Sequence, residues 1–239
     1  MLKTVMFDLD GTLLPMDQKE FTDAYFGALT GKLAAHGYDP RAFAETMWKG
    51  IVAMMKNDGT CTNEQAFWNV FDGVFGEKSR ADRHVFDEFY AVEFDGVKAH
   101  CGYNERAARA IREIKSRGLR VVLATNPFFP MVAQRKRLGW AGCDPDDFEL
   151  ITSYENSSAC KPNPAYFAEI LNKIGCTPDE CIMAGNDATE DMCAEKIGMR
   201  TFLLTECLIN KDDIDISVYP RGGFDELIDY INKILNSEF

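Results

Sequence analysis

Short apolar runs alternate with amphipathic segments through the second half of this chain. The runs that have the length and composition of strands lie at residues 119–124, 148–152, 181–184 and 200–204. Apolar residues of helical spacing lie between and after them, as in the segment that contains Ile111 and Ile114. One more strand is predicted near the start, at residues 4–9. Alternation of this kind forms βαβ units, so we expect an α/β protein with a parallel sheet in three α/β/α layers.

Residues 16–98 interrupt this alternation. Apolar side chains recur there at three- and four-residue steps, first in segments 17–36 and 40–56 and then around Phe71 and Phe89. No stretch of the block has the pattern of a strand. We therefore expect two domains, a core made of residues 1–15 and 99–239 and an inserted all-helical domain of residues 16–98.

Composition and charge exclude several classes of function. The formal net charge is -12 and no run is rich in Lys or Arg, which disfavours nucleic acid or an anionic membrane as a partner. A small anionic substrate is still compatible, because a metal ion and one or two cationic side chains can reverse the potential locally. The chain runs straight into its first strand without a signal-like or membrane-spanning segment, which predicts a cytoplasmic protein. The eight scattered cysteines form no CxxC pair and are expected to be reduced.

Two carboxylates one residue apart end the first apolar run. If residues 4–9 form a strand, its two-residue period places Asp8 and Asp10 on the same side. Two adjacent anions are costly unless a cation or a proton compensates them, so the pair suggests a metal site, an acid/base pair, or both. The alternative is a simple Asp-Gly turn at the end of a strand.

Polar residues also follow the other predicted strands. Thr125 and Asn126 come after the second strand, Lys161 lies in the loop beyond the third, and Asp187 and Asp191 follow the fourth. Ligands of parallel α/β sheets bind at the carboxyl ends of the strands, where these residues are expected to meet.

These pieces, in this order, resemble the haloacid dehalogenase superfamily. Asp8-Leu9-Asp10-Gly11-Thr12-Leu13-Leu14 is similar to its first motif, Ala124-Thr125-Asn126 to its second and Lys161-Pro162 to its third, and Gly185-Asn186-Asp187 through Asp191 is similar to its fourth. The resemblance covers nearly the whole chain. It implies a Rossmann-like core, with the helical block of residues 16–98 as the mobile α-helical cap that one subclass inserts between the first and second motifs.

The resemblance also implies roles for the motif residues. Asp8 is the expected nucleophile, which attacks phosphorus to form an aspartyl-phosphate, and Asp10 is the expected general acid and base. Thr125 is expected to donate its hydroxyl to a phosphoryl oxygen, with Asn126 beside it as a substrate-binding residue. Lys161 is expected to reach both the phosphate and Asp8.

A magnesium ion is implied at the same place. The family pattern assigns it a side-chain oxygen of Asp8, the backbone carbonyl of Asp10 and an acid of the fourth motif. This chain departs from the commoner pattern, because Asn186 stands where aspartate is usual. We favour Asp187 as the ligand and keep Asn186 as the alternative. Asp191, like Glu190, could bind outer-shell water or a neighbouring lysine, or Asp191 could simply occupy the first turn of a helix.

The function expected from these features is a Mg²⁺-dependent phosphatase that hydrolyses a small phosphorylated metabolite. A dehalogenase is disfavoured because Asp10 is present. The alternatives left open are a phosphomutase, a phosphonate hydrolase and a non-catalytic phospho-ligand-binding protein on the same fold. In the helical block, the polar loop at residues 57–62 could reach the substrate, and Arg41, Lys49 and Lys56 are available cations.

Overall fold

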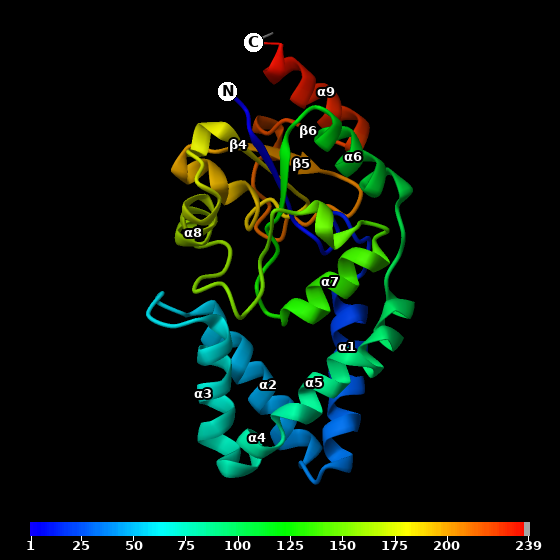
Figure 1. The fold of residues 1–239 in the computed structure, drawn as a ribbon, viewed down its shortest axis with the longest axis vertical. Helices are drawn as coiled ribbons and strands as arrows, with labels where there is room; N and C mark the ends of the chain where they lie inside the picture. Colours follow the sequence, from blue (N-terminus) through cyan, green and yellow to red (C-terminus); the bar gives the residue numbers. More distant parts are fainter. Residues whose placement is uncertain (237–239) are drawn as a thin grey trace.

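A six-stranded parallel sheet forms the centre of the protein (Figure 1). The computed structural model describes residues 1–236. The strands occur in the order β3-β2-β1-β4-β5-β6, and their bounds are β1 Thr4–Phe7, β2 Arg120–Leu123, β3 Leu150–Ile151, β4 Cys181–Gly185, β5 Arg200–Leu204 and β6 Arg221–Gly222. This is the order of a Rossmann-like sheet, so the predicted α/β fold class is confirmed.

Helices cover both faces of the sheet (Figure 1). Val5 and Phe7 of β1 belong to the apolar cluster that includes α6 and α9, whereas Met6 belongs to the cluster that includes α8. Successive side chains of a strand point to opposite faces, and here both faces are buried, which explains why β1 is apolar throughout. The helices of this part are α6 Glu105–Ser116, α7 Met131–Trp140, α8 Pro164–Ile174 and α9 Phe224–Leu235.

The strand register brings the ends of β1, β2 and β4 to one level. Phe7 lies opposite Leu123 on β2 and opposite Ala184 on β4. The chain leaves β1 for β2 on one side and later returns to β4 on the other, so the strand order reverses at β1. Ligand sites of open α/β sheets lie at such a switch point, outside the carboxyl ends of the strands.

The segment from residue 16 to 98 is helical, as predicted, and lies at one end of the molecule, below the sheet in Figure 1. Asp17, Asp39 and Thr62 cap the first three helices by accepting a hydrogen bond from a backbone amide of the first turn. The helices are α1 Gln18–Ala35, α2 Pro40–Met55, α3 Asn63–Phe75, α4 Glu77–Ala81 and α5 Arg83–Ala91, followed by the 3-10 segment η1 Glu93–His100.

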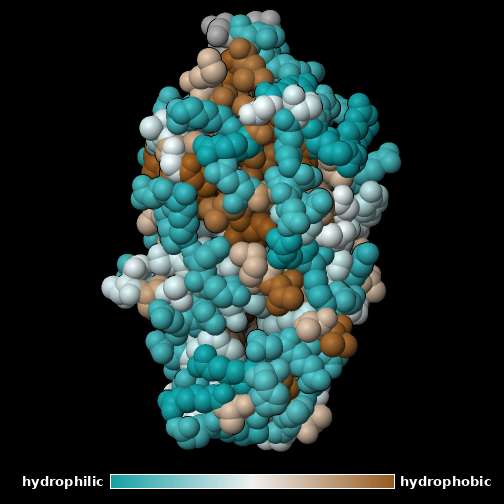
Figure 2. All heavy atoms as spheres, in the orientation of Figure 1, coloured by the Kyte–Doolittle hydropathy of each residue, from teal (hydrophilic) through white to brown (hydrophobic). Residues whose placement is uncertain are grey.

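Aromatic side chains form the interior of this helical end. The ring of Phe71 on α3 lies 5.7 Å from that of Phe43 on α2 and 5.8 Å from that of Phe86 on α5, with steep interplanar angles of 74° and 89°. Edge-to-face pairs of this kind are favourable beyond the area that they bury. The outer face of the same helices is largely hydrophilic in Figure 2. The apolar residues that recur at helical spacing in residues 16–98 therefore form the buried interior of these helices.

Several predicted boundaries are wrong. The first strand ends at Phe7 and not at residue 9, because the chain turns tightly there and the amide of Leu14 returns to the carbonyl of Leu9. The third strand is only Leu150–Ile151, shorter than the predicted 148–152, and the loop after β4 leads into the 3-10 segment η4 Met192–Ile197. The edge strand β6 was not predicted, since two residues cannot display an alternating pattern.

No helix within residues 1–236 is both long enough and apolar enough to cross a membrane.

The aromatic interior makes a stability prediction. Phe71 is fully buried, and replacing it with alanine removes its ring contacts and leaves a cavity. We expect Phe71→Ala to lower the free energy of unfolding by about 3–5 kcal/mol, measured by urea denaturation followed by circular dichroism. The matched control is Val74→Ala on the exposed side of the same helix, which should change it by less than about 0.5 kcal/mol. Equal effects of the two variants would contradict the inward packing.

Candidate active site

The residues that follow β1, β2 and β4 face a single cavity of about 290 Å³. Because these strands end at one level, Asp8, Thr125 and Asp187 leave the sheet side by side. Asp10, Asn126, Asn186, Glu190 and Asp191 line the same cavity. The structure thus brings together the residues that the sequence placed at separate strand ends.

Lys161 links two of these carboxylates. Its Nζ lies 2.8 Å from Oδ1 of Asp8 and 2.6 Å from Oδ1 of Asp191, and all three side chains are buried. Burial alone would lower the pKa of the Lys161 ammonium, but the charges of Asp191 and Asp8 outweigh it and raise this pKa well above its ordinary value. A permanent positive charge therefore sits beside Asp8.

Asp10 has a partner that the sequence pattern did not single out. Its Oδ1 accepts a hydrogen bond from Nη2 of Arg137, a completely buried side chain of α7. The guanidinium of Arg137 lies 5.2 Å from the ring centroid of Phe21 and 4.6 Å from that of Phe129. Burial lowers the pKa of Arg137 to about 9, while the negative charge of Asp8 acts in the opposite direction. Arg137 remains charged at neutral pH and holds one carboxylate oxygen of Asp10.

A weak signal for Arg137 was present in the sequence. The residue follows Arg135 and Lys136 on a segment that reads as a solvated helix face, but it lies four residues from both Ala133 and Ala141. Ala133 on α7 and Ala141 at its C-terminal cap are both fully buried, so positions at this spacing lie on the inner side of α7. An arginine at this spacing is a candidate for a buried ion pair.

A tight turn after β1 places Asp10. Strand alternation does not account for it, because both aspartates follow the end of the strand. Gly11 has a φ of +82°, and a Cβ at this position would lie 2.3 Å from Nδ2 of Asn186. Glycine is therefore required for both its conformation and the close approach. The next residue, Thr12, donates its hydroxyl to Oδ1 of Asn186 at 2.8 Å, which joins this turn to the loop after β4.

The loop after β4 distinguishes the two candidate metal ligands. Both ends of the Asn186 amide are engaged, since Oδ1 accepts from Thr12 and Nδ2 donates to the carbonyl of Cys207 at 2.6 Å. Asp187 uses only Oδ1, which accepts from the amides of Thr189 at 2.8 Å and Glu190 at 2.9 Å. No hydrogen bond within residues 1–236 is described for its Oδ2, so Asp187 has the oxygen that is available to a ligand.

Asp191 binds a neighbouring lysine, Lys161, which is one of the alternatives left open by the sequence. Its Oδ1 pairs with Lys161 and its Oδ2 accepts the amide of Asp187 at 2.9 Å. Both carboxylate oxygens are therefore engaged by the protein, which makes Asp191 a support for Lys161 and for the loop.

Asn126 has hydrogen bonds that join two loops. Its Oδ1 accepts the backbone amide of Lys161 at 2.9 Å, and its Nδ2 donates to Oε2 of Glu190 at 2.7 Å. Burial raises the pKa of Glu190 to about 7, although the positive charge of Lys161 opposes this change. Both ends of the Asn126 side chain are committed, so its contacts are those of a residue that positions Lys161.

Thr125 is held through its backbone. Its carbonyl accepts from the hydroxyls of Tyr166 and Thr152, each at 2.7 Å. Its own hydroxyl has no described partner within residues 1–236, and the residue lines the cavity. Thr125 therefore has a hydroxyl donor that faces the cavity, and its role toward a phosphoryl oxygen stays a prediction.

The oxygen atoms at this end of the cavity are compatible with Mg²⁺. Oδ2 of Asp187 has no described partner within residues 1–236, and Oδ1 of Asp8 has a second lone pair beyond the one that Lys161 uses. No backbone amide within the same residues is described as donating to the Asp10 carbonyl. Mg²⁺ binds through one or two carboxylates and keeps several waters. Within residues 1–236, no group of three or more His, Cys, Asp or Glu side chains is arranged to hold a metal. This agrees with a site to which the protein contributes only two carboxylates.

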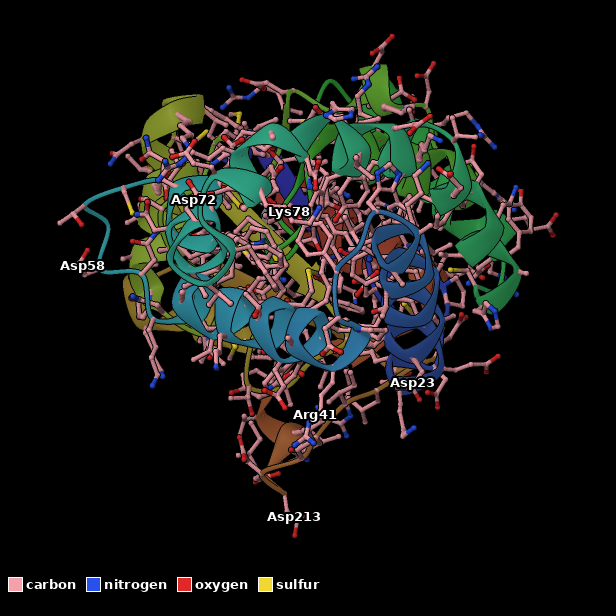
Figure 3. The ribbon with its side chains drawn as sticks, turned by 90° about the horizontal axis from the view of Figure 1, so that it is seen from below. Asp23, Arg41, Asp58, Asp72, Lys78 and Asp213 are labelled. Atoms are coloured by element: carbon pink, nitrogen blue, oxygen red, sulfur yellow. The ribbon has the colours of Figure 1, made fainter. Side chains whose placement is uncertain are left out.

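The polar loop of the helical end does not reach this site. None of residues 57–62 lines the cavity, and Asp58 points away from the body of the molecule (Figure 3). Asn57 folds the loop onto itself by donating to the carbonyl of Cys61 at 2.9 Å and to Oδ1 of Asn63 at 2.8 Å. The idea that this loop reads the substrate is not supported by its position.

The comparisons with known proteins agree with this geometry. The model of haloacid dehalogenase-like hydrolases matches residues 2–194. A glyceraldehyde 3-phosphate phosphatase of Methanothermobacter thermautotrophicus is 25% identical, over 91% of this chain and 95% of its own. Phosphoglycolate phosphatase 1 of Pseudomonas aeruginosa is 24% identical, over 85% of this chain and 69% of its own.

A solved structure has the same fold. The 2-haloacid dehalogenase from Pseudomonas syringae superposes with a TM-score of 0.66 at 20% identity, over 98% of this chain and 100% of that chain. At this identity the likeness concerns the fold alone. The family model covers most of the chain, so this chain belongs to the haloacid dehalogenase-like hydrolases.

Proposed function

We propose that this hydrolase is a Mg²⁺-dependent phosphatase that cleaves a small-molecule phosphomonoester through an aspartyl-phosphate on Asp8. The observation that carries the proposal is the buried Lys161 ammonium, which lies 2.8 Å from Asp8 and behind it, since Asp8 lines the cavity and Lys161 does not. Such a cation can stabilise a carboxylate and a phosphoryl group at one place. Two relatives are named as phosphatases, which supports the same class of reaction.

In the first half of the reaction, a carboxylate oxygen of Asp8 attacks phosphorus and the bond to the leaving oxygen breaks. Lys161 holds Oδ1 of Asp8, so Oδ2 is the oxygen that can attack. The hydroxyl of Thr125 is free to donate to a phosphoryl oxygen. In the second half, water attacks the phosphorus of the aspartyl-phosphate, which releases inorganic phosphate and restores Asp8.

Asp10 is the proposed proton carrier. It donates a proton to the leaving oxygen in the first half and takes one from the attacking water in the second. Arg137 holds Oδ1 of Asp10, which leaves Oδ2 for the transfer and fixes the orientation of the carboxyl group. Arg137 is therefore a positioning residue for this step.

The proposed magnesium ligands are a side-chain oxygen of Asp8, the backbone carbonyl of Asp10 and Oδ2 of Asp187, with Asn186 as the alternative. Mg²⁺ held by these residues would supply positive charge that offsets the negative charge of the carboxylates and of a phosphate. Asp191, considered above for the outer shell, is engaged by Lys161 instead. We also propose that residues 16–98 act as a cap domain on the core of residues 1–15 and 99–239. A cytoplasmic location stays a prediction.

The nucleophile can be tested directly. We expect Asp8→Asn to reduce Mg²⁺-dependent release of inorganic phosphate from a generic aryl phosphate by about a thousandfold or more, since the amide cannot replace the attacking carboxylate. Asp23→Asn, an exposed aspartate of α1, is the control and should keep its activity (Figure 3). Unchanged turnover in Asp8→Asn would refute the mechanism, and phosphate transfer without its release would indicate a mutase.

Removal of the buried cation should affect both stability and activity. Lys161→Met leaves Asp8 and Asp191 buried without their partner, so we expect a loss of about 3–5 kcal/mol in the free energy of unfolding together with loss of phosphate release. Lys19→Met removes the exposed ion pair with Asp23 and should cost at most about 1 kcal/mol. A stability of Lys161→Met equal to that of the control would contradict the assigned role.

The choice of metal ligand can be tested by magnesium titration. We expect Asp187→Asn to raise the Mg²⁺ concentration for half-maximal activity at least about tenfold, because it removes a negative oxygen. Asp212→Asn, which changes a neighbouring surface carboxylate, should leave that concentration unchanged. If Asn186→Ala shifts the titration and Asp187→Asn does not, the ligand is Asn186.

A further inference from the structure

The cavity has two chemically different ends. The carboxylates lie at the sheet, whereas the opposite wall is apolar and aromatic, with Tyr25, Trp48, Ile51 and Phe67 from the helices and Phe129 from the loop before α7. No Lys, Arg or His side chain lines the cavity within residues 1–236. In a phosphatase the phosphate occupies the carboxylate end, so the leaving group must lie against this apolar wall.

The cations of the helical end are directed elsewhere. Arg41 lies on the outside of α2 and pairs with Glu45 (Figure 3). Arg83 stacks on Trp68 at 4.3 Å, but its guanidinium pairs with Asp72. Lys49 and Lys56, the other cations that the sequence offered, are exposed and do not line the cavity.

This charge distribution disfavours an anionic leaving group. A second carboxylate or phosphate on the substrate would be buried without a cationic partner, and an unpaired buried charge is costly. The acids at the other end of the cavity would add repulsion. A ring-containing leaving group would instead gain from leaving water and from contact with aromatic faces.

The mouth of the cavity supports the same conclusion. Trp48 and Met55 of α2 line the cavity and are nevertheless 58% and 51% exposed. The ring of Trp48 lies 6.4 Å from that of Phe26, which also lines the cavity. Large apolar side chains exposed at the rim of a cavity mark a ligand-binding surface, and an apolar leaving group would cover them.

One hydrogen-bond donor is built into the apolar wall. The hydroxyls of Tyr25 and Tyr90 lie 2.6 Å apart, and both residues are buried and line the cavity. Only one of their two protons can lie between the oxygens, and the other has no described acceptor within residues 1–236. The wall can therefore bind one polar acceptor atom on an otherwise apolar group.

We propose that the substrate is a phosphomonoester of an uncharged, ring-containing apolar alcohol, and that small anionic esters are poor substrates. This inference rests on the proposed phosphatase function and adds the chemical class of the leaving group. It sets the chain apart from its relatives, whose names refer to glyceraldehyde 3-phosphate and phosphoglycolate.

The test compares two esters that differ in one group. Benzyl phosphate and 2-phosphoglycolate carry a phenyl ring and a carboxylate, respectively, on the same phosphorylated carbon. With the full chain and Mg²⁺, we expect kcat/KM to be at least tenfold higher for benzyl phosphate. A ratio of one, or a preference for phosphoglycolate, would overturn the inference.

A binding measurement keeps the test independent of turnover. Their non-hydrolysable counterparts are 2-phenylethylphosphonate and 3-phosphonopropionate, and tryptophan fluorescence can report binding because Trp48 and Trp68 line the cavity. We expect at least tenfold tighter binding of the phenyl compound. If the chain releases no phosphate from these esters or from the generic aryl phosphate, the phosphatase proposal fails, while this pair still decides whether the cavity selects an apolar group. Equal or reversed affinities would refute that selection.

Trp48→Arg tests the wall itself. A cation at the mouth should reduce the ratio of kcat/KM for benzyl phosphate to that for phosphoglycolate at least tenfold. Val74→Arg makes a similar change at an exposed apolar position of α3 outside the cavity and should leave the ratio unchanged. Equal ratios in the two variants would argue that the wall does not select the leaving group.

Discussion

The buried charge of Lys161 is the interaction on which the site depends. Asp8 and Asp191 are both shielded from water, and without the ammonium between them their burial and mutual repulsion would oppose folding. Placed there, the lysine neutralises part of that charge and keeps Asp8 aimed at the cavity. Structural and chemical requirements coincide, since the same cation that permits the carboxylates to be buried can also attract a phosphate.

The rest of the core brings this lysine to its position. The amide of Lys161 is held by Asn126 from the end of β2, and its ammonium is held by Asp191 from the loop after β4. Gly11 lets the turn after β1 approach that same loop. Loops from three strands are thus joined by hydrogen bonds, and the geometry around Asp8 is fixed before a substrate arrives, which is the condition for electrostatic catalysis.

Cationic and apolar side chains occupy different places around the cavity. Lys161 and Arg137 are each neutralised by carboxylates of the core, and Phe21 and Phe129 stack on the guanidinium of Arg137. The helical end contributes mainly apolar surface to the cavity, while its charged side chains lie outside. In the proposed function, this division ties the chemistry to the sheet and assigns recognition of the leaving group to the helices, so the two can vary independently among proteins of one fold.

The sequence alone determined the fold class and most of the core site. The alternation of strands and helices implies a parallel sheet, whose topology brings all carboxyl ends to one edge, so Asp8, Thr125, Lys161 and Asp187 could be placed together from chain order. The helices of residues 16–98 could also be predicted from the sequence, because their apolar residues recur at steps of three and four positions. These features depend on neighbouring residues and on general rules of connection, and both can be read without coordinates.

Tertiary structure alone decided what each side chain contacts. Arg137 and Asp10 are 127 positions apart, and no local pattern reveals that α7 turns its arginine toward the turn after β1. The commitment of both ends of Asn126, the free oxygen of Asp187 and the apolar wall of the cavity were also visible only in the folded chain. The reason is physical: a hydrogen-bond partner is set by the packing of elements distant in sequence, whereas the pattern of a segment records only which of its faces is buried.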